Sequence, residues 1–382
     1  MPAPDRTSIS GALDVKYNDT QVRVTGATVE TYGAFRIRIL RAEALAIGNI
    51  NLAWNPSTSD ITVHRVLIHR GAETIDVLKT AKFSVFQREG RLEQAMLDGL
   101  LTASLQVPGL RIGDELEFAS TSRTSKQPFT GQVFGAFALP GQLPPGRYRL
   151  DLTWSQVALK TKAAPALAPT LVEAPGRVTA TLTDPPQLSA PASSPARYAI
   201  GRVMEYSTFA RWQDVSRVEY NLFSAASQIP EDAALKAKIS GIAAGPGAPL
   251  DRARAALSLV QDDIRYVYAG MDGGDYHPAT VAQTWERRFG DCKGKTAMLL
   301  GVLRQLGIPA EAVLVSLAGG DGIDERLPSP APFDHVVVRA TIGGTRYWLD
   351  GTRTGEGRLL TDADVAFRWS RSASHRAFSR PT

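Results

Sequence analysis

The sequence has very little cysteine: one residue, Cys292, among 382. A single cysteine excludes an intrachain disulfide and a metal site built from several cysteines. It leaves two interpretations, a small apolar residue of a core or a reactive thiol. The residues around Cys292 must decide between them.

Long apolar runs and basic clusters are also missing. No stretch approaches the roughly 18–20 apolar residues that span a bilayer. The first ten residues, MPAPDRTSIS, lack the basic and apolar regions of a signal peptide. We therefore expect either a cytosolic chain or a native N-terminus that precedes this one. The net charge of +5 comes from scattered Lys and Arg without interleaved aromatic residues, which argues against a nucleic-acid partner.

The first half of the chain has the pattern of β-strands. Residues 20–185 alternate β-branched or aromatic residues with polar ones, between Gly, Pro and Asp turns. This pattern predicts an antiparallel β-sandwich. The Pro, Ala and Ser residues from 185 to 196 indicate a linker. We predict a β-rich domain over 1–205, ending in this linker, and a second domain over 206–382.

The second half predicts an α+β core with helices first and an antiparallel sheet after them. It ends in a polar C-terminal tail. Helical spacing is found at 207–226, 249–267, 280–289 and 292–307, and β-runs are found at 311–317, 335–342 and 345–350.

The stretch RRFGDCKGKTAMLL, residues 287–300, contains Gly294-Lys295-Thr296, which resembles the end of a phosphate-binding loop. That loop requires G-x-x-x-x-G-K-[ST], so its first glycine would fall at 289, where the chain has phenylalanine. The preceding residues are charged and helical in spacing, whereas the loop must follow a buried strand. Nucleotide binding is therefore disfavoured, and Lys293 and Lys295 are interpreted as solvated residues of a helix's first turn.

The same stretch suits a thiol nucleophile. Asp291 is a plausible N-cap, which places Cys292 at the first helical position. There the unpaired N–H groups and the helix dipole favour thiolate over thiol. The helix behind Cys292 is apolar on one side, which predicts that it is anchored in a core.

A thiol nucleophile needs a base and a group that orients the base. His335 begins one predicted strand and Asp350 ends the next, with Gly343-Gly344 between them as a two-residue hairpin turn. If residues 342 and 345 pair, His335 and Asp350 become diagonal neighbours on one face, within reach of a hydrogen bond.

The other histidines give weaker signals. His64 and His69 lie in one predicted strand, five residues apart, so we expect them on opposite faces and unable to share a ligand. His277 precedes a proline and is expected in a loop without a catalytic role. His375, in the polar tail, is uninformative.

Three motifs in order, GDCKGKT, FDHVVV and YWLDGT, resemble the transglutaminase-like superfamily, which has a papain-like thiol fold. The chain is similar to the bacterial branch in which a β-rich domain of unknown function precedes the core. DITVHRVLIHRG and VPGLRIGDELEF resemble that first domain, and STFARWQDV resembles the entry to the core.

The resemblance implies roles for individual residues. Cys292 would be the nucleophile, His335 the base and Asp350 its orienter. The Cys292 backbone N–H would be one oxyanion donor, with Tyr276 as a candidate for the second. Trp285 and Trp348 would be packing residues.

We therefore expect cysteine-dependent acyl transfer on amide bonds, either peptide hydrolysis or transamidation, through a thioester. The substrate would be a protein or peptide, with cell-wall peptide as one option, and neither metal nor organic cofactor is required. The resemblance also suggests the periplasm or cell envelope. The alternative is a binding or scaffold protein of the envelope that keeps the fold without chemistry.

Overall fold

The computed structural model describes residues 11–87, 96–97, 99–189, 194–195, 201–269, 276–317, 322–353, 359–362, 364 and 370–372. It consists of two compact units. The first comprises Met1–Arg88, Gly99–Ser194 and Tyr198–Thr208, and the second comprises Glu89–Asp98, Pro195–Arg197 and Phe209–Thr382. Part of the expected linker and most of the expected tail, including His375, lie outside the described residues.

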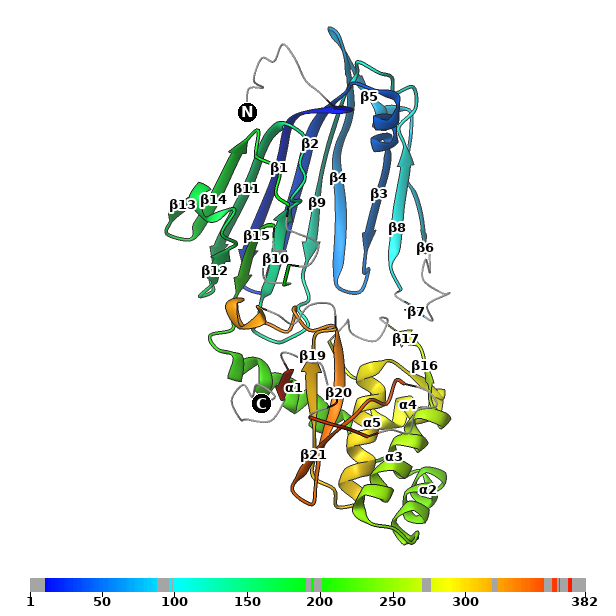
Figure 1. Ribbon diagram of the computed structural model, residues 1–382. Coiled ribbons are helices and arrows are strands. Elements are labelled where there is room, and N and C mark those ends of the chain that lie inside the picture. The colour runs from blue at the N-terminus through cyan, green and yellow to red at the C-terminus, as the bar shows by residue number, and fades with distance from the viewer. Residues whose placement is uncertain are drawn as a thin grey trace. The chain divides into compact units, whose positions relative to one another are not determined.

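A large eight-stranded sheet forms the frame of the first unit (Figure 1). In spatial order its strands are β13 (Leu171–Ala174), β14 (Arg177–Thr183), β11 (Gly146–Ser155), β1 (Leu13–Thr25), β2 (Thr28–Ile39), β9 (Glu115–Thr124), β4 (Ser59–Arg70) and β5 (Glu73–Asp76). The expected β-rich domain is confirmed. One pair differs from an antiparallel arrangement, because β1 and β11 run parallel.

Two three-stranded sheets pack against this frame. One contains β10 (Phe134–Leu139), β15 (Arg202–Ser207) and β12 (Lys160–Ala163), and the other contains β3 (Asn49–Trp54), β8 (Leu101–Gln106) and β6 (Ser84–Gln87). Val15 and Ile37 of the large sheet share one core with Leu139 and Met204. A second core joins β4 and β9 to β3 and β8. The first unit is therefore a layered β-structure.

The expectation that His64 and His69 lie on opposite faces of their strand is wrong. His64 contacts Thr121 Oγ1 at 2.7 Å, and His69 contacts Glu117 at 2.8 Å. Thr121 and Glu117 are four residues apart on β9, so both histidines lie on the same face of the sheet. The cause is a β-bulge in β4 at His64, which shifts the alternation by one residue.

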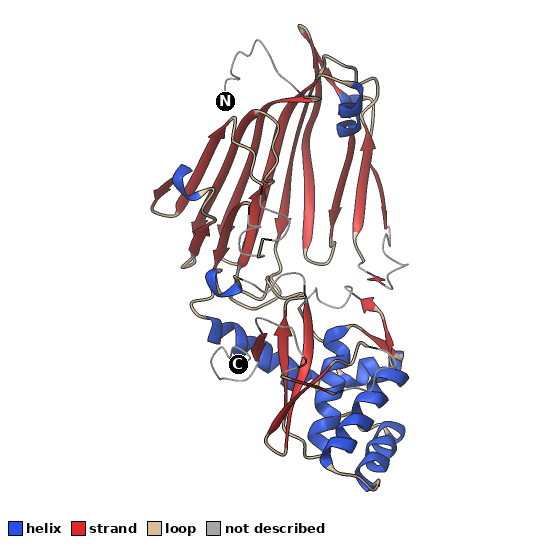
Figure 2. Cartoon of the chain, viewed as in Figure 1, coloured by secondary structure: helices blue, strands red, loops and turns tan. Residues whose placement is uncertain are grey.

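The second unit combines helices with a sheet, as Figure 2 shows by colour. Its helices are α1 (Trp212–Ala226), α2 (Ala233–Ala244), α3 (Pro249–Asp263), α4 (Val281–Arg287) and α5 (Cys292–Gln305). Its antiparallel sheet contains β22 (Leu360–Thr361), β21 (Thr345–Leu349), β20 (His335–Ile342), β19 (Ala310–Val315) and β23 (Ser370–Ser372). The α+β prediction is confirmed. Three residues of the expected tail form β23, next to β19.

Short strands complete the second unit. β16 (Arg265–Tyr266) pairs with β18 (Phe289–Gly290), and β17 (Tyr268–Ala269) pairs with β7 (Met96–Leu97). β7 comes from the first half of the sequence yet belongs to the second unit. No helix of the described residues is long and apolar enough to cross a bilayer.

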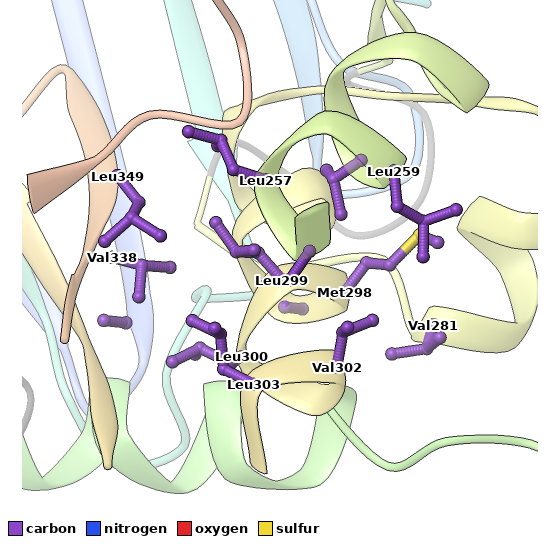
Figure 3. Packing of buried hydrophobic residues seen from close by; sticks show 14 of the residues in the cluster. Leu257, Leu259, Val281, Met298, Leu299, Leu300, Val302, Leu303, Val338 and Leu349 are labelled. Atoms are coloured by element: carbon purple, nitrogen blue, oxygen red, sulfur yellow. The ribbon is translucent and has the colours of Figure 1, made fainter. Parts of the chain in front are cut away.

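Helix α5 runs through the core of the second unit. Residues 292–303 are all buried, and Met298, Leu299, Val302 and Leu303 have no exposed side-chain surface. Figure 3 shows these residues among side chains from α3, α4 and the sheet. The predicted anchoring of this helix is therefore observed, and both of its sides, not one, are covered.

The hairpin between β20 and β21 has the register expected from its glycines. Ile342 pairs with Thr345 and Val338 pairs with Leu349. Gly343 and Gly344 have φ values of 57° and 81°, which glycine adopts without strain. The end of β21 is thereby placed beside the start of β20.

We predict opposite stability effects for the same substitution at two helical glycines. A Cβ on Gly301 of α5 would lie 2.5 Å from the Ser227 carbonyl oxygen, whereas a Cβ on Gly241 of α2 meets nothing within 4 Å. Gly241→Ala should stabilise by about 0.5–1 kcal/mol through backbone entropy. Gly301→Ala should lose that gain to overpacking, which costs about 1–3 kcal/mol. Urea unfolding followed by helical circular dichroism measures both, and equal shifts of the two midpoints would contradict the close packing.

Candidate active site

Cys292 is the first residue of α5 and is 8% exposed. Asp291 caps the helix: its carboxylate accepts hydrogen bonds from the backbone N–H groups of Lys293 and Gly294, each at 3.0 Å. Among the described residues, no hydrogen bond uses the Cys292 N–H. The cap thus occupies two of the helix's free donors and leaves the donor beside the thiol available.

His335 opens β20 and contacts both neighbours expected of a base. Its Nε2 lies 3.1 Å from Asp350 Oδ2, and Cys292, which lines the same cleft, is near enough to raise the pKa of His335. Thr352 holds the other carboxylate oxygen, Asp350 Oδ1, through its N–H at 2.9 Å and its hydroxyl at 2.6 Å. The chain therefore brings Cys292, His335 and Asp350 together in one line of contacts.

The electrostatics of this line favour a charged imidazolium. Burial lowers the pKa of His335, but the hydrogen bond to Asp350 and the charges of Asp350 and Cys292 outweigh it and raise that pKa to about 10. Burial raises the pKa of Asp350, yet the hydrogen bond and charge of His335 bring it below its usual value. Asp350 is then an ionised acceptor, and His335 Nε2 donates to it.

A cleft of about 400 Å³ opens beside this line of contacts. In the described residues, its wall includes Cys292, His335, Glu219, Tyr266, Tyr268 and Tyr276. Tyr276, the candidate oxyanion donor, therefore lies in the same cleft as Cys292. His277, Trp285 and Trp348 are not among the described lining residues.

The two tryptophans pack elsewhere. Trp285 donates its Nε1–H to Asp232 at 3.0 Å, and Trp348 donates to Asp362 at 2.7 Å. Each is 4% exposed, so both are packing residues of the second unit.

The interpretation of the two lysines as solvated is wrong. Lys293 is 8% exposed and its Nζ lies 2.5 Å from Asp291 Oδ2. Lys295 has no exposed surface and donates to the Ile264 carbonyl. Burial lowers the pKa of Lys295 to about 8, against the attraction of Asp350 and Asp262. Because α5 is covered on all sides, even its first-turn lysines must point into protein.

Three supporting residues were not found from the sequence. Thr352 has a local signal, since a Thr two residues after an Asp commonly closes a turn on the carboxylate. Gln261 of α3 donates to the Asp350 carbonyl oxygen at 2.9 Å, and no sequence pattern indicates this contact. Glu219 lies on the buried stripe of α1, where an acid is unusual.

The arrangement can perform nucleophilic and acid–base chemistry. A thiol on a fixed helix start faces an imidazolium, and the imidazolium is held by an ionised carboxylate that is itself hydrogen-bonded. Within the described residues, no three His, Cys, Asp or Glu side chains are grouped so as to hold a metal ion.

Solved structures with this architecture are known. A "putative protease" from Parabacteroides distasonis matches with a TM-score of 0.73 and 13% identity, covering 97% of this chain and 71% of that chain. At that identity the likeness shows the fold alone. LapG from Legionella pneumophila has a TM-score of 0.27, with 15% identity over 41% of this chain and 84% of its own. That value is too low to bear on the fold.

Family models match both parts of the chain, whereas comparison with curated proteins returns no match. The domain of unknown function DUF3857 matches residues 27–186, within the β-rich unit. The transglutaminase-like superfamily matches residues 236–349, which include Cys292 and His335 and end one residue before Asp350. The chain therefore belongs to the proteins in which a DUF3857 domain precedes a core of the transglutaminase-like superfamily.

Proposed function

We propose that this protein is a cysteine-dependent acyl-transfer enzyme acting on amide bonds of peptides or proteins. The observation that carries the proposal is the contact line from Cys292 through His335 to Asp350, at the wall of an open cleft. A scaffold protein needs neither of these two contacts.

In the proposed reaction, Cys292 Sγ attacks the amide carbonyl carbon and forms the C–S bond. The carbonyl electrons move to oxygen, which the Cys292 N–H stabilises, and Tyr276 from the cleft wall is the proposed second donor. His335 then gives its proton to the leaving amine as the C–N bond breaks. Water or a second amine attacks the resulting thioester and gives a proton to His335, and the C–S bond breaks, which restores the Cys292 thiolate and the His335 imidazolium.

Each neighbour supports one step of this cycle. The raised pKa of His335 supplies a proton at neutral pH for the leaving amine. Asp350, held by Thr352 and by the Gln261 bond to its carbonyl, keeps the ring oriented. The fixed start of α5 limits the motion of the sulfur.

We further propose that the substrate is a peptide, with cell-wall peptide as one option, and that the site of action is the cell envelope. Both follow from the resemblance of the sequence motifs. Fractionation of cells that express the complete gene tests the second point, and recovery in the cytosol alone would reject it.

The first prediction concerns the acyl intermediate. With p-nitrophenyl acetate, native protein should gain one hydroxylamine-sensitive acetyl group at Cys292, visible by intact-mass spectrometry. Cys292 is the chain's only cysteine, so the thioester is unambiguous. Cys292→Ala should gain none. His335→Gln should acylate about 10²–10⁴-fold more slowly, because the base is lost. Equal rates in wild type and His335→Gln would leave a reactive thiol without a catalytic base, as in the scaffold alternative.

The second prediction concerns Asp350→Asn, which keeps the shape and removes the charge. The pKa of His335 should fall from about 10, because burial is then opposed by less negative charge. The imidazolium exists below that pKa, so the variant should lose it at lower pH than wild type. Histidine-ring NMR over about pH 5–11 measures this shift, with His335→Gln to assign the signal.

Turnover of Asp350→Asn should fall roughly 10²–10⁴-fold by analogy with other triads. Asp324→Asn, an exposed acid of the same unit, is the matched control and should titrate and turn over as wild type. An unchanged His335 titration in Asp350→Asn would remove Asp350 from the proposed triad.

A further inference from the structure

Glu219 is a buried acid that the proposed reaction does not use. It lies on the inward stripe of α1, with Val215 and Phe223 as neighbours along the helix, and is 2% exposed. It also lines the cleft that contains Cys292 and His335. Among the described residues, no hydrogen bond reaches its carboxyl group.

The positive charge that acts on Glu219 belongs to Lys293, whose ammonium group already contacts other residues. Burial raises the pKa of Glu219 to about 8, and the positive charge of Lys293 offsets only part of this increase. The Lys293 ammonium lies 2.5 Å from Asp291 and 5.1 Å from the centre of the Tyr268 ring. No ion pair within 4 Å joins Lys293 to Glu219 in the described part of the chain. Glu219 therefore remains an incompletely compensated acid.

An unpaired buried carboxyl group destabilises a fold, and such groups are found where a ligand completes them. The cleft adds aromatic surface to this acid, with Phe223, Tyr266, Tyr268 and Phe333 in its wall. A carboxylate and aromatic rings together suit a positively charged amino group, through an ion pair and cation–π contact. An anionic group would face Glu219 without compensation.

We propose that Glu219 determines specificity by binding a primary ammonium group of the substrate inside the cleft of Cys292. This inference rests on the proposed function, because it concerns the same cleft. It adds the chemistry of the ligand: a peptide or acceptor that carries a free amine near the reacting carbonyl. Binding the ammonium supplies Glu219 with the partner it lacks.

The test uses the single thiol as a reporter and needs no substrate. Cys292 is labelled at about pH 8, where a carboxyl group with a pKa of about 8 is half ionised, with 2-aminoethyl methanethiosulfonate, which is cationic, and with the neutral methyl analogue. The ratio of the two rates cancels the intrinsic reactivity of the thiol and reports the preference of the cleft for a cation. Glu219→Gln should lower this ratio about 5–10-fold, a fraction of the attraction between unit charges at short range.

Glu286→Gln is the matched control. It removes the same charge from an exposed position on α4 and should leave the ratio as in wild type. The melting temperature of Glu219→Gln should be equal to or above that of wild type, because an uncompensated acid is removed. An unchanged ratio in Glu219→Gln overturns the proposal. A lowered melting temperature with an unchanged ratio would assign a structural role.

A second measurement is independent of the thiol. Binding of 1,5-diaminopentane, with 1-pentanol as the uncharged comparison, can be followed by ligand-observed NMR. Wild type should retain the amine more strongly than the alcohol, and Glu219→Gln should lose this difference. Equal retention in both proteins overturns the proposal, even if the thioester experiment succeeds. Loss of the difference supports it, even if no thioester forms.

Activity measurements on the enzyme can show whether the acyl donor or the acceptor carries the amine that Glu219 binds. If the acyl donor carries it, Glu219→Gln should raise KM for a lysine-containing peptide and leave the norleucine peptide unchanged. If the acceptor carries it, hydrolysis should persist while incorporation of 1,5-diaminopentane falls. Either result supports ammonium recognition, and a uniform loss of kcat on all substrates contradicts it.

Discussion

The burial of helix α5 is the constraint on which the second unit depends. Residues 292–303 are surrounded by protein, so the helix cannot shift without disturbing the core. Its first residue is the thiol, and the adjoining cap by Asp291 sets the direction of the free N–H groups. Packing far from the cleft thereby determines where the sulfur lies. The same burial forces Lys293 and Lys295 into protein, where one pairs with Asp291 and the other bonds to a carbonyl oxygen.

The local parts of this arrangement could be predicted from the sequence. The cap at Asp291, the helix start at Cys292 and the Gly343-Gly344 turn depend on residues within a few positions of one another. Because a two-residue turn defines the pairing of its strands, the proximity of His335 and Asp350 followed from counting. The β-rich and α+β character of the two parts also followed from periodicity.

The errors arose where a residue's surroundings come from distant segments. The burial of Lys295 depends on α3 and the sheet, so neither its charge nor its neighbours revealed it. The bulge at His64 adds one residue to a strand without any glycine or proline to mark it. The hydrogen bond from Gln261 to the Asp350 carbonyl oxygen joins helix α3 to the residue after strand β21, and no local sequence pattern connects these two segments. Glu219 is a mixed case: the sequence shows that it lies on an apolar stripe of a helix, but the cleft beside it is formed by distant segments.

The parallel pairing of β1 and β11 has a consequence for how the first unit is made. β1 pairs on one edge with β2, which follows it directly in the sequence, but its other edge is paired by β11, whose residues are synthesised much later. Until then, that edge presents free backbone donors and acceptors to other chains. Such long-range pairing is slow, because loop closure must precede the contacts that reward it. The nascent β-rich unit therefore has an aggregation-prone interval, during which a chaperone would raise the yield of folded protein.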